Sequence, residues 1–546
     1  MMRKKYLQQD LVELDLQINE VIKMRKTFYI TTPIYYPSGR YHIGTAYTEV
    51  LCDSLKRYHI MHNEDSFMLT GTDEHGQKIQ DKALELGRTP KEHVDIQAAE
   101  AKKLWSYMNI EYDKYIRTTD DYHEKVVQDI FEKFLNQGDI YLGEYEGWYC
   151  KPCESYWTET QLVDGKCPDC GREVKLMKEE AYFFKMSKYV DKLLKYYEEH
   201  PNFIKPDYRK TEMINNFIKP GLEDLCVTRT SFDWGIKVRS NPKHVIYVWL
   251  DALTNYITAL GYGQENHELF DKYWPANIHT VGKDIARFHL IYWPIFLMAL
   301  NLPLPETVYV HNFIVMKDGK MSKSKGNTIY PEQLIDKYGL DATKYYLLRE
   351  MPTSGDEVFT PEDFVNRYNS DLCNDLGNLL NRTISMINKY FEGIIPDYLG
   401  QLNTVDKSLE DEIEKSIKEN FKLIDEFEFA NSIQAIWNLV SRTNKYVDET
   451  EPWTLSKEGK INELKSAMNH LASSLKVIAI LIRPFMKDTS SKILNQLGIE
   501  TDVTFDDLKD YNSFKNVKVI EKGEPLFTRL DFELEVQNIK ELMKNK

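Results

Sequence analysis

The sequence predicts an α/β protein in which a split, doubly wound parallel sheet is followed by an α-helical bundle. Strand-like and helix-like segments alternate in two series, over residues 27–114 and over residues 235–315, and such alternation is typical of parallel sheets. A cysteine-rich insertion separates the two series. From about residue 361 to residue 498 apolar residues recur at helical spacing, which predicts the bundle.

The first 26 residues predict a short helical extension, because leucine and isoleucine recur there at helical spacing. Acidic residues interrupt its apolar stretches, so it does not look like a secretory signal. Seven cysteines, four of them clustered, favour a reducing compartment and a metal site over a disulfide scaffold. No apolar run of about 18 residues is present, so no transmembrane helix is predicted. We therefore expect a cytoplasmic protein.

The elements of the two series follow in order. The first series predicts a strand, a helix opened by a Pro- and Gly-containing loop, and a second strand; the second series predicts three more strands. The predicted segments are Phe28–Thr32, Ala46–His59, Ser66–Thr70, His244–Leu250, Ile278–Val281 and Thr307–His311.

Composition limits the function. The chain has 546 residues, enough for about two to four domains. Hydrophobic residues make up 42% of it, so several cores can form. A net charge of −15 argues against a protein that binds nucleic acid over its whole surface, but not against a local basic face.

The segment His42–Ile43–Gly44–Thr45 lies at the predicted start of the first long helix. A helix start offers free backbone N–H groups and the positive end of the helix dipole, which favour a bound phosphate. Gly44 lets a nucleotide approach the backbone closely. His42 and Thr45 can donate hydrogen bonds to phosphate oxygens. Taken alone, the segment is a weak signal, because a lone histidine at such a position is more often an ordinary helix cap or a surface residue.

A second candidate phosphate element is Lys320–Met321–Ser322–Lys323–Ser324. Two lysines beside small hydroxyl residues in a glycine-bounded loop can neutralise the charge of a polyphosphate. Phosphoryl and nucleotidyl transfer need little beyond such positioning and neutralisation. The alternative is a solvated surface loop, which is the usual role of segments rich in lysine and serine.

Together the two segments resemble the HIGH and KMSKS signatures of class I aminoacyl-tRNA synthetases, in the family's order. Thr45 stands where the family has its second histidine; threonine donates a hydrogen bond but carries no charge. From about Thr27 to Arg529 the chain resembles the methionyl-tRNA synthetase family, at Thr32–Tyr36, Gly71–Gly76, Tyr247–Ala252, Gly282–Ile285, Asn374–Arg382 and Gly523–Phe527.

The resemblance implies a Rossmann-like catalytic domain with a zinc-knuckle insertion and an anticodon-binding helical bundle. The implied division is 1–26 as N-terminal extension, 27–114 and 235–315 as the two catalytic halves, 115–234 as the connective insertion with its zinc knuckle at about 145–175, 316–365 as the KMSKS loop and stem-contact region, and 366–546 as the anticodon-binding domain.

The resemblance also implies the reaction and its residues. Methionine is activated with ATP, which Mg²⁺ accompanies, and is then transferred to tRNA(Met). The implied catalytic residues are His42, Thr45, Lys320 and Lys323. ATP is bound by His42, Gly44, Thr45, Gly282, Asp284, Lys320, Ser322, Lys323 and Ser324. Methionine is bound by Ile34, Tyr36, Asp73, Trp249, Ala252, Leu253, Tyr256, Ile285 and His289. Leu253 stands where many family members have proline.

Apolar and aromatic walls suit the thioether of methionine. Asp73 is expected to pair with the substrate ammonium, and Tyr256 and His289 to supply polar contacts near the sulfur. Without the resemblance, such aromatic residues would be read as ordinary core.

The cysteine cluster predicts a structural zinc site from its spacing alone. Cys150-x-x-Cys153 and Cys167-x-x-Cys170 supply four thiolates, enough to close a tetrahedral site. A zinc-ribbon module that binds nucleic acid is the alternative, but it leaves the lysine-rich segment unexplained. The three remaining cysteines are interpreted as buried thiols.

A candidate RNA-reading face lies in the bundle. Asn374, Asn378 and Arg382 recur every four residues and are predicted to share a helix face, while Trp453 begins another helix. Unpaired bases are read by stacking on aromatic rings and by amide or guanidinium hydrogen bonds. The resemblance implies that these four residues read the CAU anticodon; a polar bundle surface is the alternative.

Two other functions remain open at this stage. One is another class I enzyme, such as a member of the cysteinyl-tRNA synthetase family, and the other is a non-catalytic tRNA-binding relative. The insertion is too short for the editing domain of the isoleucyl, valyl and leucyl relatives, so we expect homocysteine to be rejected in the synthetic site. The chain also leaves no room for a C-terminal dimerisation domain, so a monomer is expected.

Overall fold

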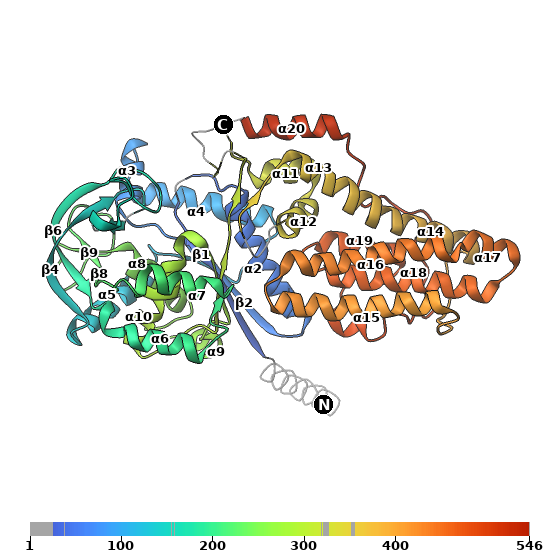
Figure 1. Ribbon diagram of the computed structural model, residues 1–546, viewed down its shortest axis with the longest axis horizontal. Helices are drawn as coiled ribbons and strands as arrows, with labels where there is room; N and C mark the ends of the chain where they lie inside the picture. Colours follow the sequence, from blue (N-terminus) through green and yellow to red (C-terminus); the bar gives the residue numbers. More distant parts are fainter. Residues whose placement is uncertain are drawn as a thin grey trace, which may run out of the picture.

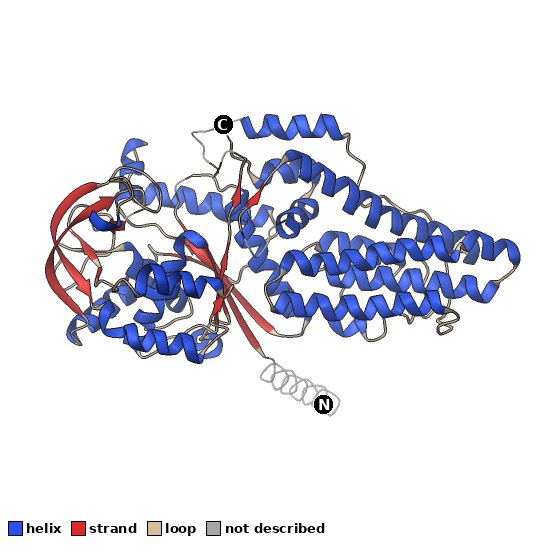
Figure 2. Cartoon of the chain, in the orientation of Figure 1, coloured by secondary structure: helices blue, strands red, loops and turns tan. Residues whose placement is uncertain are grey.

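The computed structural model describes residues 26–37, 39–153, 155–157, 159–317, 319, 321, 327–350 and 355–544. Its α/β part and its helical bundle lie side by side along the long axis of the molecule (Figure 1). Figure 2 shows that most strands belong to the α/β part and that the far half is helical. The predicted N-terminal helix, apart from Lys26, lies outside the described residues.

The central sheet consists of β1 (Thr27–Tyr35), β2 (Asp65–Thr72), β3 (Lys114–Arg117), β7 (Ile204–Lys205), β11 (Ile278–Gly282) and β12 (Thr307–His311). All of its pairings are parallel, in the order β3-β2-β1-β11-β12-β7. Ile30 of β1 lies opposite Ile278 of β11, so the two series join into one sheet. Its middle strands are buried almost throughout, as expected for strands covered on both faces. The predicted split parallel sheet is therefore confirmed.

Helices and short turns connect these strands. They are α2 (Ile43–Met61), α3 (Gln77–Glu85), α4 (Pro90–Tyr107), α5 (Asp121–Asn136), α6 (Val190–Glu199), α7 (Tyr208–Met213), α8 (Val248–Thr258), α9 (Glu268–Tyr273), η4 (Lys283–Ile285), η5 (Phe288–Tyr292) and α10 (Trp293–Leu300). Thr89 caps the start of α4 with a capping box. Its hydroxyl accepts a hydrogen bond from the Glu92 N–H, and the Glu92 carboxylate accepts one from the Thr89 backbone N–H.

One predicted strand is wrong in its second half. Residues 244–250 were expected to be extended, but only Val245–Ile246 form a strand, β10, paired antiparallel with β9 (Thr228–Arg229). The chain then turns into α8 at Val248. A short, fully buried apolar run does not separate a strand from a buried helix by its pattern. The difference matters, because α8 rather than a strand forms one wall of the cavity described below.

The cysteine-rich segment forms a separate antiparallel sheet. Its strands are β4 (Ile140–Cys150), β5 (Ser155–Trp157), β6 (Lys175–Phe184) and β8 (Leu225–Cys226), in the order β5-β4-β6-β8. The segment predicted as an insertion, 115–234, also supplies β7 and most of β3 to the parallel sheet. The chain therefore leaves the parallel sheet and returns to it within that segment.

The helical part begins after β13 (Ile314–Val315), which pairs in parallel with the later strand β14 (Glu357–Val358). Its helices are α11 (Pro331–Tyr338), α12 (Leu340–Glu350), α13 (Pro361–Arg367), the wide-turn helix η7 (Tyr368–Gly377), α14 (Asn378–Phe391), α15 (Thr404–Asp425), α16 (Phe429–Thr450), α17 (Pro452–Glu458), α18 (Ile461–Ile482), α19 (Lys487–Leu497) and α20 (Phe532–Lys544). Nearly every residue of α18 is buried, so it forms the centre of the bundle. The helix α20 returns to α11 and α13, where Tyr338 and Glu362 hydrogen-bond to it.

A buried group of charges joins the α/β part to the bundle. The Asp53 carboxylate on α2 accepts hydrogen bonds from Arg57, at 2.9 Å, and from Lys344 of α12, at 3.1 Å. All three side chains are almost completely buried, and separating such a group would leave an uncompensated charge in the interior. The helix α2, whose first turn lines the cavity, is therefore held firmly against the bundle.

Candidate active site and metal centre

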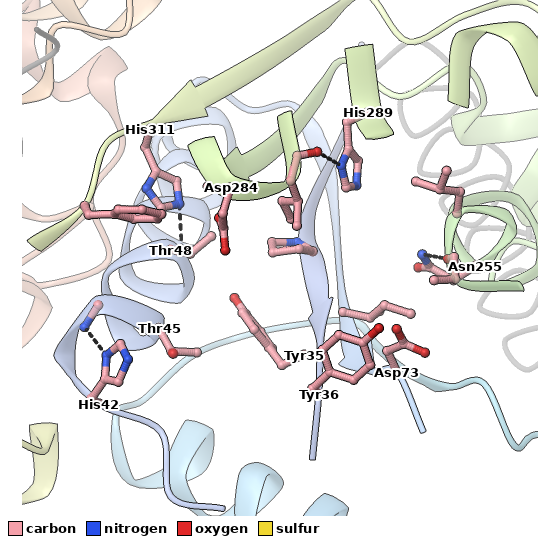
Figure 3. Close-up of a pocket in the computed structure, with 18 of the residues that line it drawn as sticks. Tyr35, Tyr36, His42, Thr45, Thr48, Asp73, Asn255, Asp284, His289 and His311 are labelled. Atoms are coloured by element: carbon pink, nitrogen blue, oxygen red, sulfur yellow. Dashed lines mark hydrogen bonds between the residues drawn. The ribbon is translucent and has the colours of Figure 1, made fainter. Parts of the chain in front are cut away.

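A cavity of about 350 Å³ opens at the carboxyl ends of β1, β11 and β12. The parallel sheet reverses its strand order between β1 and β11, and ligands of doubly wound proteins bind at such a reversal. The walls come from the end of β1, the first turns of α2, the residue after β2, helix α8 and the loops after β11 and β12 (Figure 3). Residues far apart in the sequence therefore meet around one space.

The first turn of α2 forms one end of this cavity. His42 is the N-cap residue, and its Nδ1 accepts a hydrogen bond from the Gly44 N–H at 3.0 Å. In the neutral ring this bond assigns the proton to Nε2, which is therefore a donor. A Cβ atom on Gly44 would lie 2.9 Å from Cε1 of His42, so the folded-back imidazole requires glycine there. Thr45 lines the cavity on the same turn.

Two further residues at this end, Thr48 and His311, were not predicted. The Thr48 hydroxyl lies 2.8 Å from Nε2 of His311, and Nδ1 of His311 lies 2.8 Å from the Asn312 carbonyl. Nδ1 therefore donates to the carbonyl and Nε2 accepts from Thr48. Burial lowers the pKa of His311 to about 4, so the ring is neutral at pH 7. Helical spacing could have revealed Thr48, which lies one turn after Thr45.

The other end of the cavity is apolar and aromatic. Trp249 of α8 stacks on Phe288, with ring centroids 3.4 Å apart and planes 11° apart, and so presents a rigid wall. Asp73, which directly follows β2, brings a carboxylate to the same space. All nine residues predicted to bind methionine line this one cavity: Ile34, Tyr36, Asp73, Trp249, Ala252, Leu253, Tyr256, Ile285 and His289.

Tyr256 and His289 form a hydrogen-bonded pair in this wall. The Tyr256 hydroxyl lies 2.7 Å from Nε2 of His289, and Nδ1 of His289 lies 2.9 Å from the Ile285 carbonyl. Because Nδ1 donates to the carbonyl, Nε2 accepts from the phenol. Burial lowers the pKa of His289 to about 4, which keeps the ring neutral. This pair therefore adds hydrogen-bonding groups to the cavity wall without adding a charge.

The remaining predicted nucleotide residues divide into two groups. Gly282 and Asp284 line the cavity between its two ends, and a Cβ on Gly282 would lie 2.7 Å from Oδ1 of Asp284. Met321 also lines it. The neighbours of Met321 that were predicted to bind ATP lie outside the described residues: Lys320, Ser322, Lys323 and Ser324. Two further lining residues are Asn255 and Tyr35; the latter lies in the Thr32–Tyr36 segment but was given no role.

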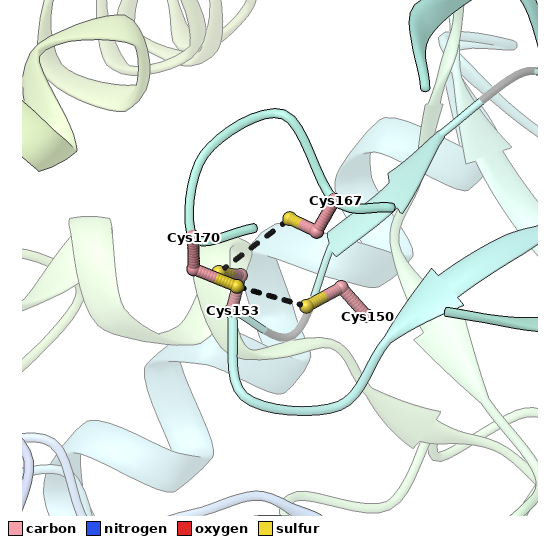
Figure 4. A group of neighbouring side chains, drawn as sticks. All are labelled: Cys150, Cys153, Cys167 and Cys170. Atoms are coloured by element: carbon pink, nitrogen blue, oxygen red, sulfur yellow. Dashed lines mark hydrogen bonds between the residues drawn. The ribbon is translucent and has the colours of Figure 1, made fainter. Parts of the chain in front are cut away.

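The four clustered cysteines meet in space, as Figure 4 shows. Their Sγ atoms all lie within 4.8 Å of one another, with Cys150 to Cys170 at 3.5 Å and Cys153 to Cys167 at 3.8 Å. Four sulfurs bound to a tetrahedral zinc at about 2.3 Å stand about 3.8 Å apart. Both the thiolate donors and their spacing therefore suit zinc, and with all four positions filled by protein the site is closed in the manner of a structural site.

The predicted RNA-reading residues lie on the bundle. Asn374 belongs to η7, Asn378 and Arg382 belong to α14, and Trp453 begins α17, at the far end of the bundle in Figure 1. Both asparagines are exposed, and so is the Trp453 ring, 47% of whose surface is accessible. Asn374 accepts a hydrogen bond from Arg529 at 3.2 Å, and Arg382 pairs with Asp448 at 3.2 Å. These residues are therefore accessible to a partner.

None of the described helices is both long enough and apolar enough to cross a membrane.

Comparison with known families covers most of the chain. A family model described as tRNA synthetases class I (M) matches residues 28–176 and 170–384. A second model, described as anticodon binding domain of methionyl tRNA ligase, matches residues 395–538. The first model thus ends within α14, and the second begins between α14 and α15.

Individual relatives are similar over nearly the whole chain. The methionine–tRNA ligase of Bacillus subtilis is 57% identical over 528 residues, which is 94% of this chain and 79% of that protein. The methionine–tRNA ligase of Oceanobacillus iheyensis is 56% identical over 532 residues, with 95% and 79% covered. Among solved structures, Mycobacterium tuberculosis methionyl-tRNA synthetase in complex with methionyl-adenylate is 36% identical, has a TM-score of 0.88, and covers 92% of this chain and 100% of its own.

Proposed function

The chain belongs to the methionyl-tRNA synthetase family of class I synthetases, and from this premise we propose how its residues divide the reaction among them. The enzyme is a methionine–tRNA ligase. A carboxylate oxygen of L-methionine attacks the α-phosphorus of ATP, the bond to the β-phosphate breaks, and methionyl-adenylate and pyrophosphate result. A ribose hydroxyl of the 3′-terminal adenosine of initiator or elongator tRNA(Met) then attacks the adenylate carbonyl, and AMP leaves.

The first turn of α2 stabilises the phosphate charge. The N–H groups of Ile43 and Gly44 already donate to the Ile329 carbonyl and to Nδ1 of His42. An anion is therefore favoured here by the Nε2–H of His42, the Thr45 hydroxyl and the positive end of the α2 dipole. Lys320 and Lys323, with Ser322 and Ser324, neutralise the leaving pyrophosphate. Mg²⁺ enters with ATP on its phosphate oxygens, which suit this hard cation. No side-chain nucleophile is required.

The nucleoside and the amino acid take the rest of the cavity. Asp284, beside the backbone left open by Gly282, contacts the nucleoside of ATP. Asp73 pairs with the substrate ammonium in a charge-assisted bond. The thioether lies among Ile34, Tyr36, Trp249, Ala252, Leu253 and Ile285, with the pair Tyr256–His289 next to the sulfur.

What supports these assignments is that one cavity unites an anion-binding helix start with a neutral aromatic wall. An enzyme that joins the α-phosphate of ATP to the carboxylate of an amino acid with an uncharged side chain needs both ends within the length of one small molecule. A polar or charged side chain such as that of aspartate would lose its hydration against this wall without gaining a partner charge.

Beyond the cavity, the cysteine site holds one structural zinc ion and gives the antiparallel sheet a fixed shape next to the catalytic part. Asn374, Asn378, Arg382 and Trp453 read the CAU anticodon by hydrogen bonds and stacking. We also propose the domain division given by the sequence, a monomeric enzyme, and a cytoplasmic location that suits its free thiols.

Amino-acid-dependent exchange of pyrophosphate into ATP tests the activity directly. We expect exchange with methionine and none of comparable efficiency with cysteine, isoleucine or valine. A strong preference for cysteine would assign the chain to a different class I activity. Binding of tRNA without any exchange would identify a non-catalytic tRNA-binding protein instead.

A further inference from the structure

A buried carboxylate behind the methionine wall is bonded to two histidines. Oδ2 of Asp251 lies 2.7 Å from Nδ1 of His75, and Oδ1 lies 2.8 Å from Nε2 of His123. Asp251 and His123 are fully buried, and His75 is 3% exposed. None of the three lines the cavity. We call this group the Asp251 bridge.

The Asp251 bridge joins two elements at the amino-acid end of the cavity to each other and to α5, which supplies His123. Asp251 lies in the first turn of α8, the helix that supplies Trp249, Ala252, Leu253 and Tyr256 to the cavity wall. His75 lies two residues after Asp73, in the loop that leaves β2. One carboxylate therefore ties the thioether wall to the loop that presents the ammonium-binding residue.

A second contact fixes the other end of the same helix. His123 of α5 uses its remaining ring nitrogen, Nδ1, to contact the hydroxyl of Thr258 at 2.7 Å. Thr258 is the last residue of α8, about two turns after Asp251. The two contacts of His123 therefore span α8 from its first turn to its last, and α8 cannot slide along α5 without breaking one of them.

The loop that carries His75 is held from its other side as well. The His75 ring meets Trp234 edge-on, with centroids 5.5 Å apart, and the Trp234 indole N–H donates to the Glu74 carbonyl at 2.7 Å. Glu124 of α5 faces the second nitrogen of His75 at 3.4 Å. The described groups around His75 are thus two carboxylates and one indole.

The charges in the Asp251 bridge favour a fixed geometry. Burial alone would lower the pKa of His75, but attraction to Asp251, helped by Glu124, outweighs it and raises this pKa to about 10. Burial raises the pKa of Asp251, but His75 and His123 outweigh it, so that this pKa lies below its usual range. A charged imidazolium thus faces a carboxylate at pH 7. Removing one partner would leave the other as an unpaired buried charge.

We propose that Asp251 is a positioning residue for methionine: through His75 and His123 it sets the separation between the α8 wall and Asp73, and thereby the fit of the thioether chain. This inference rests on the proposed function, because it takes Asp73 and the α8 residues as the methionine contacts. Small displacements of binding groups are costly, since about 1 Å of misplacement lowers rates by as much as about 100-fold.

The test compares the isosteric variant Asp251→Asn with the wild type in pyrophosphate exchange. We expect the KM for methionine to rise about tenfold or more while the KM for ATP stays within about twofold. Preference for methionine over ethionine, whose side chain is one methylene longer, should fall, because a displaced wall no longer matches one chain length. Asp406→Asn is the matched control: Asp406 is also a buried first-turn acid, bonded to Tyr446 at 2.6 Å and Ser466 at 2.9 Å, but it lies in the bundle. Its variant should leave both KM values unchanged.

Thr258→Val provides a milder variant if Asp251→Asn fails to fold. It removes only the hydroxyl bonded to His123, and we expect a rise of about two- to fivefold in the KM for methionine alone. The inference would be overturned by a folded variant whose KM for methionine and preference for methionine are both unchanged. It would also be overturned if the KM values for ATP and for methionine rose by the same factor. Failure of the proposed function would be seen differently, as a wild type without methionine-dependent exchange.

Discussion

The hydroxyl of Tyr256 lies 2.7 Å from Nε2 of His289, and this one hydrogen bond makes the far wall of the cavity polar without making it charged. The two residues come from α8 and η5. Nδ1 of His289 is already engaged with the Ile285 carbonyl. The phenol is therefore the donor that satisfies Nε2, and its oxygen retains lone-pair capacity toward the cavity.

Tyr256→Phe should weaken methionine binding. The variant removes the hydroxyl and leaves Nε2 of His289 as a buried acceptor without this donor, so we expect the KM for methionine to rise about tenfold, with little change in the KM for ATP. Steady-state pyrophosphate exchange measures both. Tyr446→Phe, which removes the buried phenol bonded to Asp406 in the bundle, is the control. Equal behaviour of the two variants would argue against a role of Tyr256 in methionine binding.

Three buried histidines should make the protein sensitive to acid. Burial lowers the pKa of His279, His289 and His311, the last two to about 4, from an ordinary value of 6.5. Between pH 4 and pH 6.5 the unfolded chain binds more protons than the folded one, so this contribution to stability is complete above pH 6.5 and is lost as pH falls toward 4. Each group with a value near 4 contributes up to about 3 kcal/mol.

Urea unfolding at pH 7.5, 6 and 5 measures this contribution. His289→Asn should reduce the loss of unfolding free energy between pH 7.5 and pH 5, because one titrating group has gone. His267→Asn changes an exposed histidine at the N-cap of α9 and should leave the dependence of the unfolding free energy on pH unchanged. If the unfolding free energy of His289→Asn depends on pH as strongly as that of the wild type, the buried ring does not contribute to this dependence.

Local patterns indicated different amounts at different places. Cys150 and Cys153 carry a metal-site spacing that indicates their chemistry directly, whereas His42, Gly44 and Thr45 only follow a predicted strand and open a helix, and the family resemblance alone assigns them to phosphate. The strands at Ile278 and Thr307 were also predicted, because β-rich runs bounded by turn residues are distinctive. What these predictions share is a local signal.

Other parts depended on tertiary contacts and could not be predicted. Val248–Trp249–Leu250 is apolar and suits a strand as well as a buried helix, and only packing decides that α8 starts there. His311 and Asn255 line the cavity because β12 and α8 converge on it, and the spacing of residues along the sequence does not predict this convergence. The Asp251 bridge joins residues 75, 123 and 251, and none of them is adjacent to another in sequence.

Thr45→Val should slow adenylate formation. If the hydroxyl contacts a phosphate whose charge grows in the transition state, its loss lowers the kcat of pyrophosphate exchange by about 10- to 100-fold and leaves the KM for methionine unchanged. Thr45→Ser should retain most activity. Thr404→Val changes another threonine in the first turn of a helix, α15, and serves as the control. Full activity of Thr45→Val would show that this position needs no hydroxyl.

Metal analysis should find one zinc ion per chain, bound by the four cysteines. Cys167→Ser replaces a buried thiolate by a poor zinc ligand, so its zinc content and its melting temperature should both fall. Cys373→Ser, on the partly exposed helix η7, should keep the full zinc content. Equal zinc content in the two variants would place the metal elsewhere.

Trp453→Ala should impair tRNA charging without affecting amino-acid activation. Nearly half of the Trp453 surface is exposed at the end of the bundle, so we expect the ring to stack on an anticodon base. Stacking of a base on an aromatic side chain contributes about 1–3 kcal/mol. The kcat/KM for tRNA with a CAU anticodon should therefore fall about 5- to 150-fold, while pyrophosphate exchange, which needs no tRNA, stays at the wild-type rate. The decisive comparison uses a second tRNA whose anticodon is changed: the wild type should discriminate strongly between the two, and Trp453→Ala should discriminate less. A variant that loses charging of both tRNAs by the same factor has lost general affinity for tRNA rather than anticodon reading.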